Sequence, residues 1–517
     1  MTAAPGKPNA PRAAPTLRTD TLADSVIILL ALTVLQRLIG FGRAVLFCRW
    51  LDPDQLGQWD MAFSFLMLAA PLSVFSLSGS FGRYVEHFRT RQQLRTFLRR
   101  TAVFCAFLAV PAVLLIYTAR QWFSQLIFGT PEQSELVAVL AVSLLAVVAT
   151  NYFIDLFNAL RNVRLIAALQ LFNTVAFAVL AVGLLLFWRC TAATVVIAYG
   201  GATMLCALGA LVWLRRSWRA FPENEGHLPQ RELWSKVLPF VAWVLATSTL
   251  ANLFAVVDRY MIIHFSAVPA AEALARVGDY HSSRVVPLLF VSVAMMLSTT
   301  ATPHLSHEWE TGQRERVAQR LNLIVKLLGL ILFAAAVAVL LAAPLLFGVA
   351  LKGKFAGGLA VLPWTLTYCI WFGMQAVCQN YLWCAEKARL ASLALLIGLI
   401  ANVGLNLLLL PRLGLLGAVL ATTVANLLAL VLICGFNHLL GFRLSFGAGV
   451  VLAMPITICF GPWLALAVLL AAVLQVVTSE RLFSQAEKRQ IADRYRVYAE
   501  RFRGLLPTRK PAERGSG

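Results

Sequence analysis

Long runs of apolar residues dominate the chain, and short breaks containing charged residues, proline or glycine separate them. A helix that crosses a bilayer needs about 20 apolar residues, and clusters of charge, proline and glycine mark the connections between such helices. The pattern predicts about fourteen membrane-spanning helices. They are expected at residues 24–47, 60–81, 101–119, 135–157, 165–187, 192–213, 237–263, 284–303, 323–349, 358–383, 390–410, 413–436, 445–460 and 462–478.

Composition supports this membrane assignment. Of the 517 residues, 60% are hydrophobic and 13% are charged, whereas soluble domains carry about 45–50% apolar and about 25% charged residues. One soluble core cannot hide such an excess of apolar side chains. We therefore expect an all-α integral membrane protein whose first apolar run stays as a helix instead of being cleaved as a signal peptide.

The basic residues are distributed unevenly between the two sides of the predicted membrane. The net charge is +20, and most lysines and arginines fall in segments on the same side as the N-terminus, including residues 83–100 and the connector 214–236. Loops that remain in the cytoplasm collect such residues. This pattern predicts a multi-pass protein of the cell inner membrane with both termini cytoplasmic, and it explains the charge without nucleic-acid binding.

The two halves of the chain repeat a similar order of segments. In each half, a helix with an arginine near its end (Arg43 or Arg259) is followed by an outward loop, a helix rich in serine or threonine and a charged segment. We predict two six-helix lobes related by a pseudo-two-fold axis along the membrane normal, plus two extra C-terminal helices. The expected boundaries are a disordered cytoplasmic N-terminus at 1–23, lobes at 24–213 and 237–436, a connector at 214–236, extra helices at 437–478 and a tail at 479–517.

The tail alternates apolar residues at helical spacing with lysine and arginine. This pattern is typical of a basic amphipathic helix on the inner leaflet. A helix that docks on a partner is the alternative interpretation.

Four arginines at or near membrane depth are candidates for binding an anionic substrate. Charge at this depth costs about 2.5–3.5 kcal/mol on insertion scales, so each such residue needs a reason. Arg37 and Arg43 lie in the first predicted helix, Arg259 ends the seventh and Arg284 begins the eighth. They would present positive charge to a phosphate in a central cavity. Alternatively, Arg43 extends to the outer interface.

Acidic and amide residues in the spans form a second group of candidates. Asp155 and Asp258 would carry a coupling proton or sodium ion, although Asp155 is equally suited to a structural role beside Arg161. Gln375 and Gln379 are one turn apart on one helical face. They would either bond between helices or contact saccharide hydroxyl groups.

The sequence lacks the motifs that are typical of enzymes, which argues against an enzyme. The nine cysteines include no CxxC pair, and no histidine pattern such as HExxH occurs, so neither a metal nor another cofactor is expected. We also find no phosphate-binding loop, no GxSxG motif and no outward-facing DxD motif.

Two stretches resemble polysaccharide-biosynthesis flippases, a family of the multidrug/oligosaccharidyl-lipid/polysaccharide (MOP) exporter superfamily. The first runs from Gln36 to Arg43 and on through Leu51–Gly57. The second is Thr302–Ser306 with the following Gly312-Gln313-Arg314. The likeness extends over nearly the whole chain. The region near Arg37 and Arg43 also resembles lipid II flippases, but Ala44 stands where many of these have an acid.

The resemblance implies two lobes around a cationic cavity and alternating access driven by an ion gradient or membrane potential. The expected substrate is a polyprenyl-diphosphate-linked oligosaccharide, a precursor of a surface polysaccharide such as lipopolysaccharide. Expected partners are this lipid-linked oligosaccharide, membrane lipids, and a polysaccharide polymerase or glycosyltransferases. Two rivals stay open: a cation or drug antiporter of the same superfamily, and a membrane glycosyltransferase.

Overall fold

A computed structural model describes residues 22–221 and 228–493, and all regular elements in this part of the chain are helical. The predicted disordered N-terminus, part of the connector and most of the predicted tail lie outside the described residues. The helices are α1 Leu22–Trp50, α2 Pro53–Ser73, η1 Leu77–Ser80, α3 Phe81–Thr90, α4 Leu94–Thr118, α5 Arg120–Phe128, η2 Pro131–Gln133, α6 Ser134–Ala159, α7 Val163–Phe187, α8 Ala192–Ser217, η3 Trp218–Ala220, α9 Gln230–Phe265, α10 Ala270–Arg284, α11 Pro287–Glu310, α12 Arg314–Leu345, η4 Leu346–Ala350, α13 Ala356–Cys384, α14 Ala388–Leu413, α15 Leu415–Leu439, α16 Phe446–Ala453, η5 Met454–Phe460 and α17 Pro462–Thr478.

The predicted all-α membrane fold is confirmed. Within the described residues, 11 helices are long and apolar enough to cross a membrane, or 12 if the bent pair Pro53–Ser73 and Leu77–Thr90 is counted as one span. Two shorter apolar helices, Phe446–Phe460 and Pro462–Thr478, correspond to the last two predicted spans. Together these segments account for the about fourteen spans that the apolar pattern predicts.

The second predicted span, 60–81, was placed too late. The helix begins at Pro53, because proline already has the backbone angle that the first helical turn requires. It ends at Ser73, since Phe75 and Ser76 have positive φ angles of 52° and 53° that interrupt a right-handed helix. The chain then bends by 61° into η1 and α3.

The stretch between the predicted spans 237–263 and 284–303, expected to be an outward loop, instead contains a helix. Residues 270–284 form α10, which buries an apolar side that includes Ala273, Leu274 and Val277. Arg284 is therefore the last residue of α10, not the first residue of the eighth span, and Pro287 opens α11.

Close contacts divide the chain into two compact units. The first comprises Met1–Leu289, Ala343–Leu362 and Leu395–Ala425, and the second comprises Phe290–Ala342, Pro363–Ala394 and Asn426–Gly517. The six-helix lobes and their boundaries remain a prediction.

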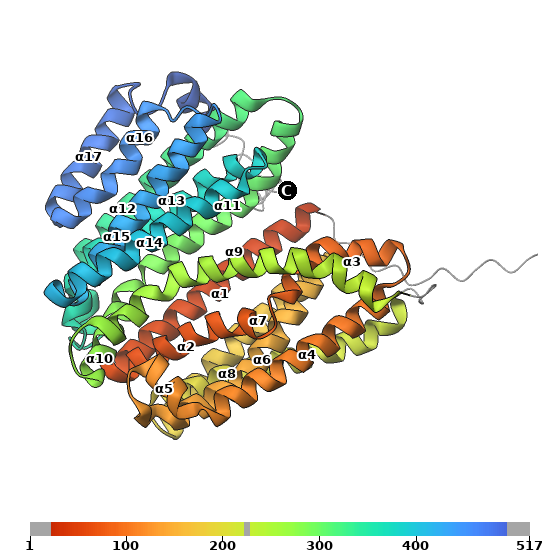
Figure 1. Cartoon of the computed structure of the whole chain (residues 1–517). Helices are drawn as coiled ribbons and strands as arrows, with labels where there is room; N and C mark the ends of the chain where they lie inside the picture. Colours follow the sequence, from red (N-terminus) through yellow and green to blue (C-terminus); the bar gives the residue numbers. More distant parts are fainter. Residues whose placement is uncertain (1–21, 222–227, 494–517) are drawn as a thin grey trace, which may run out of the picture. The chain divides into compact units, whose positions relative to one another are not determined.

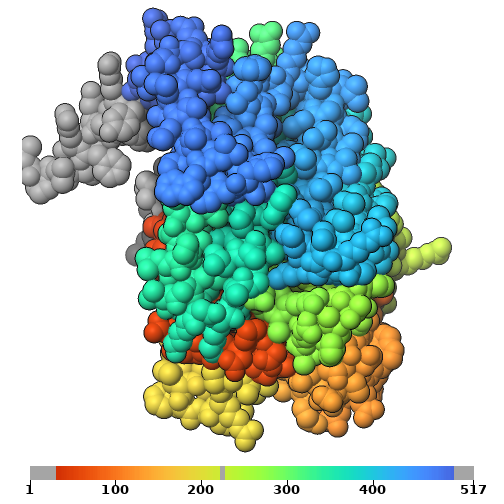
Figure 2. All heavy atoms as spheres, turned by 90° about the vertical axis from the view of Figure 1, so that its left-hand side faces the viewer, coloured from red at the N-terminus to blue at the C-terminus, as the bar shows by residue number. Residues whose placement is uncertain are grey.

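In the first unit, α6 packs on α8, α8 on α7, and α7 on α1 (Figure 1). The closest approach of two helices there joins α2 and α10. The Cα of Gly57 lies against the carbonyl of Leu274, and that of Gly278 against the carbonyl of Pro53, so a side chain at either position would overlap backbone. Next to this pair, Gly129 at the end of α5 lies beside Ala270; Figure 2 shows the atoms of this α10 region (green) beside those of the α5 region (orange).

Buried amide side chains connect the helices of the second unit. The Asn380 amide donates to Ser298 at 2.8 Å, and Thr302 donates to the Asn380 carbonyl oxygen at 2.7 Å. Residues 485–493, the described helical part of the predicted tail, are joined to α12 by a Lys326–Glu487 ion pair of 2.9 Å.

Candidate functional site

A cavity of about 410 Å³ lies inside the first unit, between α2, α6 and α9. This volume is within the about 300–1,000 Å³ that is typical of small-molecule sites. Apolar side chains from α2 and α6 form much of the wall. The polar lining residues are Ser76, Ser78, Asn151, Tyr152, Asp155, Tyr199, Ser248 and Asn252.

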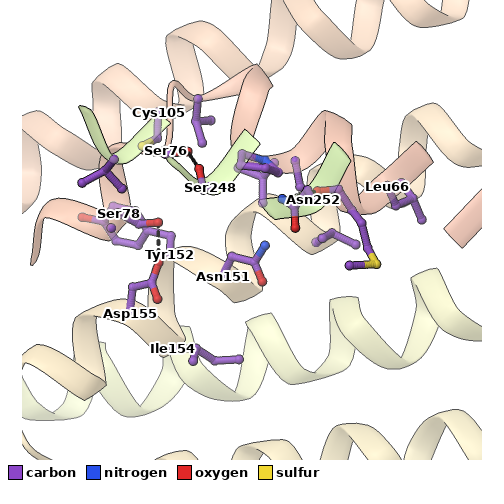
Figure 3. Close-up of a pocket in the computed structure, with 18 of the residues that line it drawn as sticks. Leu66, Ser76, Ser78, Cys105, Asn151, Tyr152, Ile154, Asp155, Ser248 and Asn252 are labelled. Carbon is purple, nitrogen blue, oxygen red and sulfur yellow. Dashed lines mark hydrogen bonds between the residues drawn. The ribbon is translucent and has the colours of Figure 1, made fainter. Parts of the chain in front are cut away.

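The break between α2 and α3 supplies one polar wall of the cavity. Because the left-handed Phe75 and Ser76 turn the chain away from the axis of α2, the serines of this segment lie beside α6 and α9 instead of continuing a helix. Ser78 donates to Asp155 at 2.6 Å, and the hydroxyls of Ser76 and Ser248 are 3.1 Å apart. Figure 3 shows both hydrogen bonds at the wall of the cavity.

Asp155, on α6, is the charged side chain of this lining. It accepts a hydrogen bond from the neutral Ser78 at 2.6 Å, and no salt bridge to it occurs among the described residues. The structure does not pair it with Arg161. An acid that faces a cavity without a fixed cation can accept a proton or bind a cation.

The other polar side chains of the cavity are hydroxyls and amides. Asn151, also on α6, is exposed, while Asn252 on α9 donates to the carbonyl of Met67 at 3.2 Å. The Tyr152 hydroxyl donates to the Leu98 carbonyl at 3.0 Å. Such groups bind uncharged polar ligands.

Arg43 lies on an aromatic cluster that reaches the cavity. Its guanidinium carbon is 4.0 Å from the centroid of the Phe177 ring, and Phe177 contacts Tyr199, whose ring centroid is 5.1 Å away. Trp59 joins the same cluster. A cation over an aromatic face is stabilised by the ring quadrupole. Arg37, two turns earlier on α1, is exposed.

A buried ionic cluster joins α2, α9 and α10 on the Pro53 side of the cavity. Asp60 accepts from Arg259 Nε at 2.6 Å and lies 2.9 Å from His281 Nδ1. Arg284 is 3.9 Å from the same carboxylate. The side chains of Asp60 and Arg259 are 5% and 6% exposed. Removing one partner of such a buried pair is costly, because the other charge is left uncompensated.

Asp258 sits in a separate buried network beside this cluster. It accepts from the Tyr280 hydroxyl at 3.3 Å and from the Asn406 amide at 3.4 Å. Asn406 in turn donates to the Asn402 side chain at 2.7 Å. This network fixes α9 against α10 and α14.

At the far end of α10, Asp279 accepts from the backbone N–H of Gly358 at 3.3 Å, in the first turn of α13. Burial raises the pKa of Asp279 to about 6, and the hydrogen bond from Gly358 opposes this shift. A carboxylate at a helix N-terminus also interacts favourably with the helix dipole.

The structure brings some predicted site residues together and separates others. Arg259 and Arg284 converge on Asp60, and Asp155 lines the cavity. Gln375, which is buried, and Gln379, which is partly exposed, belong to the second unit.

The sequence pattern does not predict the positions of Asp60 and His281 in the site. The predicted second span begins at residue 60, which makes Asp60 its boundary, and residue 281 falls between two predicted spans. The rule that flagged Asp155, an acid inside an apolar helix, would have found Asp60 had Pro53 been taken as the start of α2.

Comparisons with known proteins give the family and the fold. The model of a family described as polysaccharide biosynthesis protein matches residues 22–309. No curated protein matches the chain.

Solved structures of low sequence identity have the same fold. The lipid II flippase MurJ in an inward closed conformation is 12% identical, with a TM-score of 0.66 over 87% of this chain and 98% of that one. An inward-facing multidrug resistance MATE family transporter of the MOP superfamily is 15% identical, with a TM-score of 0.62 over 80% and 97%. A MOP superfamily transporter from Pyrococcus furiosus is 14% identical, with a TM-score of 0.55 over 81% and 94%. These matches show that the chain shares their fold, and the family model confirms the predicted polysaccharide-biosynthesis family.

Proposed function

The chain belongs to the polysaccharide biosynthesis protein family, and we propose that it is a flippase for a polyprenyl-diphosphate-linked oligosaccharide. It moves this lipid from the inner to the outer leaflet of the bacterial inner membrane by alternating access, with both termini in the cytoplasm. The proposal agrees with the fold shared with MurJ, which is named a lipid II flippase.

The composition of the first unit's cavity is the observation that carries the proposal. Its polar lining consists of serine, asparagine and tyrosine, apart from Asp155. Saccharide hydroxyl groups both donate and accept hydrogen bonds, so hydroxyl and amide side chains complement them. A site for a hydrophobic cation would not need this number of neutral polar groups.

Arg43 is the proposed diphosphate ligand. Its guanidinium is held next to Tyr199 of the cavity by Phe177, and arginine suits phosphate because of its planar set of donors. Arg259 and Arg284 are engaged by Asp60 in this structure. They become available to the diphosphate only when the Asp60 cluster opens.

Two further roles complete the proposed cycle. Asp155 carries the coupling ion, and the Asp60 cluster holds the outward end of the first unit closed while the cavity accepts substrate. Net transport requires that the lipid or the ion bind the inward-open and outward-open states differently. Gln375 and Gln379 are proposed saccharide contacts from the second unit, and Asp258 is a proposed second ion-coupling residue.

The test is the accumulation of lipid-linked saccharides in a strain that lacks this protein but retains its cytoplasmic glycosyltransferases. We expect completed lipid-linked units to build up. Wild-type protein should relieve this build-up, and Arg43→Ala should not. The control variant Arg316→Ala, which removes an exposed arginine outside the cavity lining, should relieve it as wild-type protein does. If the lipid pool of the deletion strain equals that of wild type, the proposal is wrong.

One observation favours a second candidate, a cation or drug antiporter. The charged residue in the cavity lining is Asp155, and no arginine or lysine is among the lining residues. A MATE family multidrug transporter shares the fold. Increased sensitivity of the deletion strain to cationic compounds, without accumulation of lipid-linked saccharides, would favour this function.

A further inference from the structure

A basic hollow lies at the end of α4 that the charge pattern places in the cytoplasm. It has a volume of about 680 Å³, and its lining includes Arg95, Arg99, Arg100 and the aromatic Trp218 and Trp234. None of the described residues that line the hollow is acidic. Arginine beside tryptophan is typical of the membrane–water interface, where headgroups meet hydrocarbon.

Backbone contacts fix two of the three arginines. Arg95 donates to the carbonyl of Phe221 at 2.6 Å, and Arg100 donates to the carbonyl of Leu228 at 2.6 Å. Each of these bonds uses one of several guanidinium donors. Arg99 is exposed, and no hydrogen bond or ion pair to it is found in the described part of the chain. Three positive charges thus surround one hollow, and two of them are fixed by backbone contacts.

An apolar groove continues from this hollow along α4. The groove has a volume of about 380 Å³ and is lined mainly by side chains of α4, α6 and α8. Arg99, Val103 and Trp218 line both the hollow and the groove. From Leu98 to Ala109 the groove follows α4 for about 16 Å, which is about half of the about 30 Å hydrocarbon thickness of a bilayer.

The groove is separate from the central cavity. Cys105, Val148 and Tyr152 line both spaces, so they form the wall between them. The Tyr152 hydroxyl is fixed in this wall by Leu98 and by Thr101 at 3.1 Å. Val103, which lines the groove, and Phe107, which lines the neighbouring hollow, are 63% and 70% exposed, as expected of side chains that face lipid.

We propose that this hollow and groove bind an anionic phospholipid of the surrounding membrane. The phosphodiester headgroup lies among the three arginines, and one acyl chain lies in the groove along α4. Positive charge at one end and an apolar channel about one leaflet long match the two parts of such a lipid. Its place outside the central cavity distinguishes it from the transported lipid.

Native mass spectrometry of the detergent-purified full chain tests the proposal. Phosphatidylglycerol should bind more tightly than phosphatidylethanolamine with the same chains. Because a basic residue near anionic lipid contributes about 1 kcal/mol, Arg99→Ala should weaken phosphatidylglycerol binding by about fivefold. Arg316→Ala, which removes an exposed arginine elsewhere, should leave binding unchanged.

A second variant tests the groove independently of the headgroup. Ala106 is exposed in the groove, so Ala106→Phe fills it without changing charge. This variant should weaken the binding of dioleoyl but not of dihexanoyl phosphatidylglycerol, whereas Arg99→Ala should weaken both. Unfolding temperatures of both variants close to that of the wild type would show that the fold is retained.

Four results would overturn the proposal. The first is equal binding of phosphatidylglycerol and phosphatidylethanolamine, and the second is an Arg316→Ala variant that weakens binding as much as Arg99→Ala does. The third is competition by inorganic phosphate together with equal binding of long-chain and short-chain phosphatidylglycerol. The fourth is displacement of phosphatidylglycerol by a polyprenyl-diphosphate saccharide. The last result would assign the groove to the transported lipid. None of these binding measurements depends on whether the protein flips saccharides.

Discussion

Two aspartates inside helices of the first unit have opposite surroundings. Asp60 is buried with Arg259 at 2.6 Å and His281 at 2.9 Å, whereas Asp155 faces the cavity with the hydroxyl of Ser78 at 2.6 Å. Both carboxylates carry the desolvation cost of their positions. For Asp60 the protein supplies the compensating charge, and for Asp155 the cavity leaves space for a mobile cation or a proton.

The comparison separates two tasks of a transporter. A carboxylate with fixed cations from α9 and α10 connects helices and holds one end of the unit together. A carboxylate with a neutral partner can change its ligand without breaking a helix contact. Under the proposed function, Asp60 is the residue that we expect to hold one end of the unit closed, and Asp155 is the residue that we expect to couple transport to an ion.

The largest expected effect comes from breaking the Asp60 cluster. Asp60→Ala leaves Arg259 buried without its partner, which should lower the free energy of unfolding by about 3–5 kcal/mol. The drop in unfolding temperature of the purified protein measures it. Asp60→Ala combined with Arg259→Ala should recover part of the stability, because no uncompensated charge remains. If Asp60→Ala alone were as stable as the wild type, the structural role of the Asp60–Arg259 pair would be contradicted.

The contact between α2 and α10 offers a second way to disturb the same end. At Gly57 an added side chain meets the Leu274 carbonyl, so Gly57→Ala should cost about 1–3 kcal/mol of stability. Gly40 on α1 has nothing within 4 Å of an added Cβ, and Gly40→Ala should therefore be neutral or slightly stabilising. Equal unfolding temperatures of the two variants would argue against close packing at Gly57.

Sequence patterns predicted the helices well and the contacts between them less well. The apolar runs identified nearly every span because each must match the thickness of the bilayer. The break after Ser73 was missed, since Phe75 and Ser76 adopt positive φ angles that their residue types do not indicate. Helix α10 was missed because its length is below that of a span, and its buried side is recognised only against Gly57 of α2.

The candidate site was predicted only in part, for a related reason. Charge inside an apolar run marked Asp155, Arg43 and Arg259, because such charge is costly wherever it occurs. Whether a charge is neutralised depends on residues distant in sequence: Arg259 lies 199 positions from Asp60. No local pattern reports such a pairing.

At the other aspartate, Asp155→Asn should leave the fold intact and remove ion coupling. The amide keeps the shape of the side chain but cannot carry the charge, so we expect transport to fall at least about tenfold, equivalent to about 1.4 kcal/mol. Transport measured with and without an imposed ion gradient checks this. The control is Ser78→Ala, which removes the hydrogen bond to Asp155, worth about 0.5–1.5 kcal/mol, but keeps the carboxylate. Its transport should therefore still respond to the gradient. If Asp155→Asn responds to the gradient as wild type does, Asp155 is not the coupling residue.

A smaller effect is expected at Arg43. Arg43→Lys keeps the charge but loses the flat guanidinium over Phe177, an interaction worth about 0.5–2 kcal/mol. Transport should fall severalfold, and Arg43→Ala should reduce it further because the charge is lost as well. The rates of saccharide transport by the two variants measure this. If Arg43→Ala transported saccharide faster than Arg43→Lys, the proposed role of Arg43 would be contradicted.

A further prediction concerns pH and Asp279. Since burial raises its pKa from 3.8 to about 6, the folded protein holds this proton more tightly than the unfolded chain does. Stability from this group is therefore greatest at low pH and falls as the pH rises from about 4 to about 6. Asp279→Asn should remove this fall in unfolding temperature. A wild-type and a variant protein with parallel pH profiles would show that Asp279 does not contribute.

The most direct test of the proposed function is saccharide flipping by the purified protein in liposomes. A polyprenyl-diphosphate-linked oligosaccharide would be placed in the inner leaflet, and its appearance outside would be followed with a saccharide-cleaving enzyme. We predict flipping by wild-type protein and by Ala106→Phe, whose change lies outside the cavity, and none by Asn151→Trp, which fills the cavity. Flipping by Asn151→Trp at the wild-type rate, or a wild-type rate equal to that of empty liposomes, would contradict the account.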